Sequence, residues 1–409
     1  MLFLGGVETV NSSTAPPDRA LLTYEAAVIL GEATQFTSNL VPDVAVGPLN
    51  LPPAALTIHS NDDGKVWNGP GWNGSAFADP LDEYPRCHLL STGEIFFSGY
   101  APHAASLNHD GPPAAGGPGI WSQANHQPGQ PGVFSSNWPH ERHDGSAVLF
   151  PNLGSTYDQI LRLGGADGFA GPTTDSVESF DAAIPGNTWK SESAMPATKS
   201  NVSDGGRLFA NLVILPTGDL LLLGGQYQSI TLTEKLLVPL LFTGGAWVPL
   251  APNPTVSPRT YHSVSVFLPD GRIFLGGGND RDYDYEIFSP PYLDNSANRP
   301  TNLQWVSQPP FLDDDFDAYV LEHNEEYAVS FNPLPLGQEF TKVVLMAPCS
   351  VTHHSDMSQR YVELRCTPNG NQVTFRLGSE HTETVLPRGI YMMFFVTNTS
   401  VSHATWVMI

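Results

Sequence analysis

Short apolar runs separated by turn residues recur along the chain. Residues 89–99, 215–225 and 268–277 read LLSTGEIFFSG, LPTGDLLLLGG and LPDGRIFLGG. In each stretch a turn with glycine separates two apolar runs, which predicts a β-hairpin. A looser copy covers residues 147–165, and MLFLGG at residues 1–6 resembles the second half of another. Helical periodicity is nearly absent, so the pattern predicts an all-β fold.

The spacing of these hairpins indicates a repeat. Their closing glycines fall at positions 6, 99, 165, 225 and 277, and the gaps shrink toward the spacing of about 50 residues that is typical of kelch repeats. A further strand follows the hairpin, as in SVESFD at 176–181 and YEIFSP at 285–290. Four strands per unit arranged radially make a β-propeller, with the paired glycines packed closely near its axis. A generic antiparallel sandwich array is the alternative.

The pattern changes near residue 290. Alternating stretches such as EEYAVSFNP, TKVVLMAP, QRYVELRC and GIYMMFFVTN follow, without closing Gly-Gly pairs. About seven strands in roughly 110 residues are typical of an immunoglobulin-like sandwich. We therefore predict a kelch β-propeller, incomplete or seven-bladed, over residues 1–295 and an immunoglobulin-like β-sandwich over residues 296–409.

Charge and cysteine content exclude several classes of protein. The net charge is −23, from 18 Lys and Arg against 41 Asp and Glu, which argues against nucleic acid and anionic membranes as partners. The sequence contains no run of 18 apolar residues, so it predicts no membrane-spanning helix. Three cysteines exclude a disulfide-dense scaffold, and Cys349 and Cys366 form either one bridge or two free thiols. N-x-S/T sequons at Asn11, Asn73, Asn201 and Asn398 fit a secreted protein.

Two short segments carry candidate chemistry. Tyr261 and His262 lie in RTYHS, directly before an apolar strand, and His353 and His354 lie in SVTHHSDMSQR, a loop between two apolar strands. Loops on rigid scaffolds concentrate binding groups, and imidazole together with phenol suits copper(II). A packed tyrosine with a hydrogen-bonded imidazole, and a polar surface loop, are the competing interpretations.

Longer segments around these residues resemble the galactose oxidase and glyoxal oxidase family of copper radical oxidases. They are RTYHSVSVFLPDGRIFLGGGN with YEIFSPPYL, and VVLMAPCSVTHHSDMSQRYVEL with the ending LPRGIYMMFFV…ATWVMI. The resemblance implies a C-terminal early-set domain and one copper ion, held by Tyr261, His262 and His353, with His354 as the alternative to His353. It also implies that Tyr261 is the catalytic base. The expected reaction is oxidation of a primary alcohol or aldehyde, as a small molecule or carbohydrate, by O2 to give H2O2 outside the cell.

One part of the family pattern is not found. The family cross-links a second tyrosine, in an R-W-Y-P-like motif, to a cysteine through a thioether that serves as the radical cofactor. Tyr84 is a stand-in for this tyrosine, but Cys87 lies three residues along the same strand and points to the opposite face, so we expect no cross-link between them. The sequence shows four complete or nearly complete units and part of a fifth, where the family has seven blades, and we expect a truncated start. A non-catalytic propeller that binds glycan or protein is the alternative function.

Overall fold

The structure is a computed structural model of the chain. It describes residues 58–59, 66–67, 86–98, 105–108, 120–122, 142–150, 156–166, 171–184, 187–198, 205–227, 234–252, 258–278, 284–294, 298–306, 309–314, 316–356 and 358–409. Within these residues the chain forms β-strands, turns and the 3-10 helix η4 (Pro291–Leu293), with no α-helix. The all-β prediction is confirmed.

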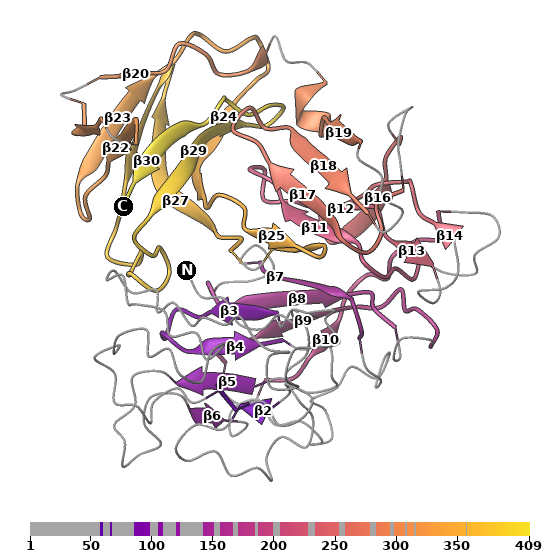
Figure 1. The fold of residues 1–409 in the computed structure, drawn as a ribbon. Helices are drawn as coiled ribbons and strands as arrows, with labels where there is room; N and C mark the ends of the chain where they lie inside the picture. Colours follow the sequence, from indigo (N-terminus) through magenta and orange to yellow (C-terminus); the bar gives the residue numbers. More distant parts are fainter. Residues whose placement is uncertain are drawn as a thin grey trace, which may run out of the picture.

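Small antiparallel sheets follow one another along the first part of the described chain (Figure 1). Three of them have four strands: β3–β6 (Cys87–Leu89, Ile95–Phe97, Ala105–Asn108, Ile120–Ser122), β7–β10 (Ser146–Leu149, Gln159–Leu163, Val177–Asp181, Lys190–Ser191), and β11, β12, β15 and β16 (Asn211–Ile214, Leu220–Leu223, Leu240–Thr243, Ala246–Pro249). A sheet of three strands comes next: β17–β19 (Ser263–Phe267, Ile273–Gly277, Tyr285–Phe288). Two-stranded pairs are β1–β2 (Ile58–His59, Val66–Trp67) and β13–β14 (Gln226–Tyr227, Glu234–Lys235). Strands that are neighbours in the chain are neighbours in each sheet, as in propeller blades.

The paired glycines lie where one blade contacts the next. Gly164 and Gly224 have φ angles of 63° and 66°. A Cβ atom on Gly164 would lie 2.6 Å from the carbonyl oxygen of Arg207, and one on Gly224 would lie 2.5 Å from that of Arg259. Only glycine fits such a close backbone approach at positive φ. The close packing that the Gly-Gly pattern predicts is therefore confirmed.

A buried arginine precedes the inner strand of three blades and ties it to these glycines. Each guanidinium donates to the carbonyl oxygen of a closing glycine of its own blade: Arg142 to Gly164 at 2.9 Å, Arg207 to Gly224 at 2.9 Å and Arg259 to Gly277 at 3.0 Å. The next glycine along donates its N–H to the arginine carbonyl of the following blade, Gly165 to Arg207 at 2.8 Å and Gly225 to Arg259 at 2.7 Å. The repeat thus joins adjacent blades through backbone groups.

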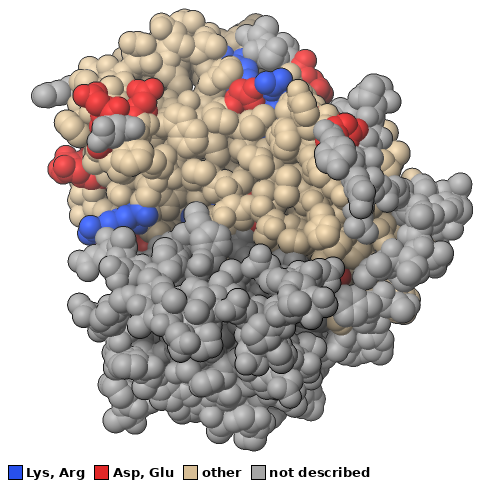
Figure 2. Space-filling model, in the orientation of Figure 1, with Lys and Arg blue, Asp and Glu red and all other residues tan. Residues whose placement is uncertain are grey.

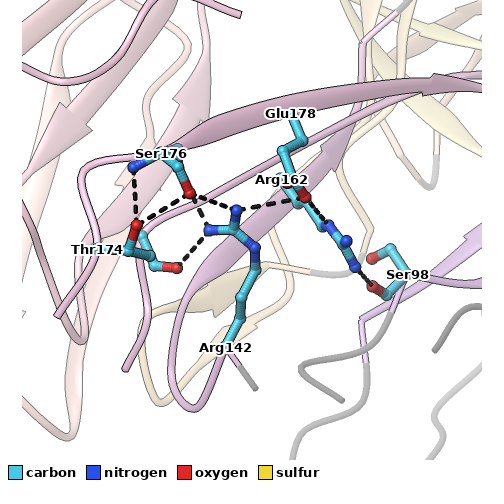
Figure 3. Close-up of polar contacts among 7 residues, drawn as sticks. Ser98, Arg142, Arg162, Thr174, Ser176 and Glu178 are labelled. Atoms are coloured by element: carbon cyan, nitrogen blue, oxygen red, sulfur yellow. Dashed lines mark hydrogen bonds and ion pairs between the residues drawn. The ribbon is translucent and has the colours of Figure 1, made fainter. Parts of the chain in front are cut away.

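One of these arginines belongs to a buried ionic network between the first two blades (Figure 3). The Glu178 carboxylate lies 2.7 Å from Arg162 Nε and 3.3 Å from an Arg142 nitrogen, and all three side chains are almost fully buried. Arg162 also donates to the carbonyl oxygen of Ser98 on the preceding blade. Burial lowers the pKa of Arg142 to about 10, opposed by Glu178. Buried charges of this kind are tolerated only when they are paired and hydrogen-bonded.

The C-terminal part forms a nine-stranded sheet that curls over on itself (Figure 1). Residues 361–364 of β27 pair with β24, whereas residues 365–369 pair with β28, so β27 passes from one half of the curled sheet to the other. In order across the sheet the strands are β20 (Gln304–Trp305), β23 (Glu326–Ser330), β28 (Gln372–Arg376), β27 (Tyr361–Asn369), β24 (Phe340–Met346), β29 (Ile390–Thr397), β30 (Thr405–Met408), β22 (Ala318–Val320) and β21 (Leu312–Asp313). The sandwich-like character predicted for this region is confirmed, and the domain boundary at residues 295 and 296 stays a prediction.

Strand β29 and the second half of β24, residues 343–346, are buried on both faces, which explains their apolar sequences. One face, including Val343 and Phe395, contributes to the core enclosed by the curled sheet. The other face, including Val344 and Phe394, joins a second core that continues into the blades. There the Phe394 ring meets the Phe267 ring of β17 edge-on, with centroids 5.6 Å apart. The C-terminal sheet and the last blade therefore share one hydrophobic core.

The surface agrees with the acidic composition. Figure 2 shows acidic side chains at several places on the face in view, with basic side chains beside some of them. Among the described residues, no helix has the length and apolar character needed to cross a membrane. Asn398, the one sequon asparagine within the described residues, is exposed, while Asn11, Asn73 and Asn201 lie outside them.

Candidate metal centre

Tyr261 and His262 occupy a tight turn at the start of the blade β17–β19. The Ser263 N–H donates to the Thr260 carbonyl oxygen at 3.0 Å, which closes the turn. His262 is its third residue and has a φ of 66°, a conformation usually left to glycine or asparagine. Directly before the turn, the Arg259 guanidinium donates to the carbonyl oxygen of Gly277 and so attaches the turn to its own blade. As a result Tyr261 is half-buried and the imidazole of His262 is exposed.

His353 and His354 form the tip of a hairpin that reaches out from the C-terminal sheet. Strands β25 (Val351–Thr352) and β26 (Ser355–Asp356) pair Thr352 with Ser355, which leaves the two histidines as a two-residue turn. Their φ angles are 49° and 60°, so both central residues are left-handed, as a type I′ turn requires. Figure 1 shows β25 beside the inner strands of the blades, and the hairpin contacts β17 and β11.

The hairpin brings His353 to the Tyr261 turn. Ring centroids lie 3.9 Å apart for Tyr261 and His262, 4.6 Å for His262 and His353, and 5.5 Å for Tyr261 and His353. His354 instead meets the ring of Phe209 edge-on at 5.5 Å, and Phe209 also packs against Tyr261 at 5.1 Å. The structure thus places the predicted residues Tyr261, His262 and His353 together. The alternative, His354, packs against Phe209.

Hydrogen bonding and burial distinguish the two histidines of the turn. Nδ1 of His353 lies 2.7 Å from the Thr352 hydroxyl oxygen, which fixes the orientation of the ring. His354 is buried, and neither of its ring nitrogens has a hydrogen-bond partner in the described part of the chain. Burial, with a smaller effect of His262, lowers the pKa of His353 to about 4. Burial also holds the pKa of His354 well below its usual value, and the charges of Arg86 and His353 lower it further. The Gly145 backbone has a smaller, opposite effect on this pKa, although it does not form a hydrogen bond with the ring.

Backbone strain gathers at this site. Eight described non-glycine residues have positive φ, and four of them are Phe209, His262, His353 and His354. Each such conformation costs about 1–3 kcal/mol and persists only where surrounding structure enforces it. An aromatic residue at φ 56°, as in Phe209, is especially unfavourable. Half of the described non-glycine residues with positive φ therefore lie at this site.

The donor set suits a copper ion. Two imidazoles and one phenol offer nitrogen and oxygen ligands of the kind that tetragonal copper(II) accepts. The low pKa of His353 leaves that imidazole neutral at pH 7, the form that can bind a metal. No group of three or more His, Cys, Asp or Glu side chains suited to a metal occurs among the described residues, and this cluster contains only two such side chains.

The cysteines take no part in this cluster. All three are free thiols, so the alternative of two free thiols at Cys349 and Cys366 is the one that the structure shows. Cys87 is buried on β3, and burial strongly raises the pKa of its thiol. Tyr84, the stand-in for the second tyrosine, lies outside the described residues. The thioether therefore stays an expectation from the resemblance.

Sequence reasoning missed two residues of the site, Phe209 and Thr352. A signal for Phe209 was present: it follows Arg207 by two residues, as Tyr261 follows Arg259. The two aromatic side chains thus occupy equivalent places in adjacent blades and pack together at the site. Thr352 carried no signal, because a hydroxyl next to a histidine gains meaning only from the hairpin geometry.

The protein is all-β, with blade-like sheets followed by a curled C-terminal sheet. Its candidate site combines the Tyr261–His262 turn of one blade with the histidine hairpin of the C-terminal part. Residues 312–409 match the family model described as galactose oxidase-like, early set domain. Aldehyde oxidase GLOX1 of Arabidopsis thaliana is 26% identical over 278 residues, covering 61% of this chain and 43% of the relative. Galactose oxidase of Gibberella zeae is 29% identical over 272 residues, covering 63% of this chain and 36% of the relative. The matches thus span less than half of either relative's length.

A solved structure has a similar fold. A fungal alcohol oxidase of the AA5 family, in complex with copper, superposes with a TM-score of 0.61 over 84% of this chain and 68% of its own, at 18% sequence identity. At that identity the likeness concerns the fold alone. Together with the family match and the two relatives, it confirms the predicted resemblance to the galactose oxidase and glyoxal oxidase family.

Proposed function

We propose that this chain forms the copper-binding part of an oxidase that converts a primary alcohol or aldehyde with O2, releasing H2O2. The observation that carries the proposal is the convergence of Tyr261, His262 and His353, whose ring centroids all lie within 5.5 Å of one another. The oxidase names of the relatives, and copper in the structural neighbour, support the choice of metal and reaction. The resemblance also supports a location outside the cell.

Bound copper would supply Lewis acidity and one-electron redox chemistry. The chain's own residues supply the rest. His262 and His353 would hold the ion through imidazole nitrogens, with the Thr352 hydroxyl fixing the His353 ring. The phenol oxygen of Tyr261 would accept the hydroxyl proton of the substrate. Phe209, packed against Tyr261, keeps water away from one side of that phenol. In the net reaction RCH2OH and O2 become RCHO and H2O2.

The alternative function is that of a propeller without catalysis. The sequence lacks the R-W-Y-P-like motif that carries the radical tyrosine in the family. A propeller that keeps the histidine and tyrosine cluster but not this tyrosine would bind glycan or protein without catalysis. The two functions share the scaffold and differ in whether peroxide forms.

Copper titration of the purified chain tests the proposal directly. We expect one Cu(II) ion per chain with the electron paramagnetic resonance signal of a tetragonal site. His353→Ala should abolish that signal, whereas the matched variant His354→Ala should keep it, because His354 points to Phe209. Equal loss in both variants, or no stoichiometric binding, would contradict the metal site. If copper binds but no peroxide appears across a panel of alcohols, aldehydes and sugars, the non-catalytic function replaces the oxidase.

A further inference from the structure

A cavity lies apart from the Tyr261 cluster, between the first two blades and the C-terminal sheet. It has a volume of about 340 Å³, and its wall includes His88 of β3, Leu149 of β7, Arg360 and Tyr391. This volume falls in the range of small-molecule sites, which are mostly apolar with a few polar groups in fixed positions. Its position at an interface between two parts of the chain is also typical of such sites.

Arg360 gives this cavity its charge. One guanidinium nitrogen donates to the carbonyl oxygen of Leu89 at 3.0 Å. Within the described residues, no carboxylate lies within ion-pair distance of Arg360. Burial lowers the pKa of Arg360, opposed by Tyr391 and then by Asp158. The Asp158 carboxylate itself accepts hydrogen bonds from the backbone and hydroxyl of Ser91. Because Arg360 is partly buried and has no carboxylate partner among the described residues, the site is suited to an anion.

The other ionisable groups of the cavity wall are neutral or already paired. Burial, then the charges of Arg360 and Arg86, lower the pKa of His88 to about 3. Burial raises the pKa of the Cys87 and Cys349 thiols, so both stay protonated at pH 7. Arg388 forms a 2.8 Å ion pair with Glu383. Arg360 is therefore the cation that an incoming anion would meet.

The rest of the wall is apolar and defines the body of the ligand. Its apolar members come from both sides of the interface: Leu89, Ile95, Leu149, Pro348 and Ile390, with the ring of Tyr391. Such a wall favours a hydrocarbon or aromatic group over a hydrated inorganic ion, because burying apolar surface is favourable. The planar fork of a guanidinium matches a carboxylate.

We propose that this cavity binds a small organic monocarboxylate, with its carboxylate on Arg360 and its apolar body between Leu149 and Ile390. The site also lies at the root of the histidine hairpin. Cys349 stands two residues before β25, and Ser358, Gln359 and Arg360 follow β26. A ligand bound here would bridge the hairpin root to the first blade and hold the hairpin against it.

Isothermal titration of the full chain with benzoate tests the proposal, with benzamide as the neutral isostere. We expect one saturable benzoate site and at least tenfold weaker binding of benzamide. Arg360→Met should weaken benzoate binding at least tenfold. Arg388→Met, at the same cavity but paired with Glu383, should change it less than twofold. Absence of saturable binding, unchanged binding to Arg360→Met, or equal weakening in both variants would overturn the proposal.

A measurement on the wild-type chain covers the case in which Arg360→Met does not fold. Cys349 lines the cavity, whereas Cys366 lies on β27 and does not. We expect saturating benzoate to slow alkylation of Cys349 at least fivefold and to leave that of Cys366 unchanged, as followed by mass spectrometry. Equal rates at Cys349 with and without benzoate would overturn the proposal. Neither assay depends on copper or on oxidase activity.

Discussion

The backbone N–H of His354 donates to the carbonyl oxygen of Ser263 at 2.8 Å, across 91 positions of the chain. This bond joins the tip of the histidine hairpin to the first residue of β17, directly after the Tyr261–His262 turn. It therefore fixes the relative position of the two segments that supply the ring cluster.

The strain in the turn of this hairpin predicts an unusual order of variant stabilities. His354→Ala removes the ring but keeps a Cβ at φ 60°, whereas His354→Gly removes both. We expect the glycine variant to be about 1 kcal/mol more stable than the alanine variant, because left-handed backbone costs that much for a residue with a Cβ. Urea unfolding of both variants measures the difference. An alanine variant as stable as the glycine variant would show that the turn is unstrained.

The fold was readable from the sequence because its signals are local. Hairpin turns such as Asp270-Gly271 and the Gly-Gly pairs are set by short-range backbone geometry. The cluster of Tyr261, His262 and His353 could be proposed only through resemblance, since its parts lie about 90 residues apart in the sequence and no spacing rule joins them. The preference for His353 over His354 also came from the resemblance, and the turn supplies a physical reason for it, because adjacent residues in a type I′ turn point different ways.

Crowding at the blade contacts gives a second prediction. Gly224→Ala and Gly244→Ala both place a Cβ at positive φ, 66° and 57°. At Gly224 the new atom would lie 2.5 Å from the Arg259 carbonyl oxygen, while nothing lies within 4 Å at Gly244. We expect Gly244→Ala to cost about 1 kcal/mol and Gly224→Ala about 1–3 kcal/mol more through overpacking. Chemical denaturation would refute this reasoning if the two variants lost the same free energy of unfolding.

The buried network of Figure 3 predicts a large effect from a small chemical change. Glu178→Gln keeps the shape of the side chain but leaves Arg142 and Arg162 without their shared carboxylate. We expect a loss of about 3–5 kcal/mol in the free energy of unfolding. The control Glu383→Gln breaks an exposed pair with Arg388 and should cost less than about 1 kcal/mol. Thermal and urea unfolding compare the two, and a loss below that of the control would contradict a structural role for the network.

His88 predicts a specific dependence of stability on pH. Its pKa is about 3 in the folded chain, through burial and then Arg360 and Arg86, against an ordinary value of 6.5. Below pH 6.5 the unfolded chain takes up a proton that the folded chain refuses, so stability falls as the pH drops from 6.5 toward 3. His88→Gln should remove a slope of about 1.4 kcal/mol per pH unit in this window. Urea unfolding at pH 6.5, 5.5 and 4.5 measures it, with the exposed His323→Gln as control. Parallel curves for wild type and His88→Gln would exclude this origin of the slope.

Thr352 tests whether the orientation of His353 matters to the metal site. Its hydroxyl oxygen lies 2.7 Å from Nδ1 of His353, and partners that orient a ligating imidazole typically change metal affinity 10–100-fold when removed. Thr352→Val is nearly isosteric and suits a strand, so the hairpin should persist while Cu(II) affinity falls by about that factor. Thr352→Ser keeps the hydroxyl and should bind Cu(II) as the wild type does. Competition titration against a chelator of known affinity measures both variants. If valine and serine bind equally tightly, the ring is held by its packing against His262 and Tyr261 rather than by the hydroxyl.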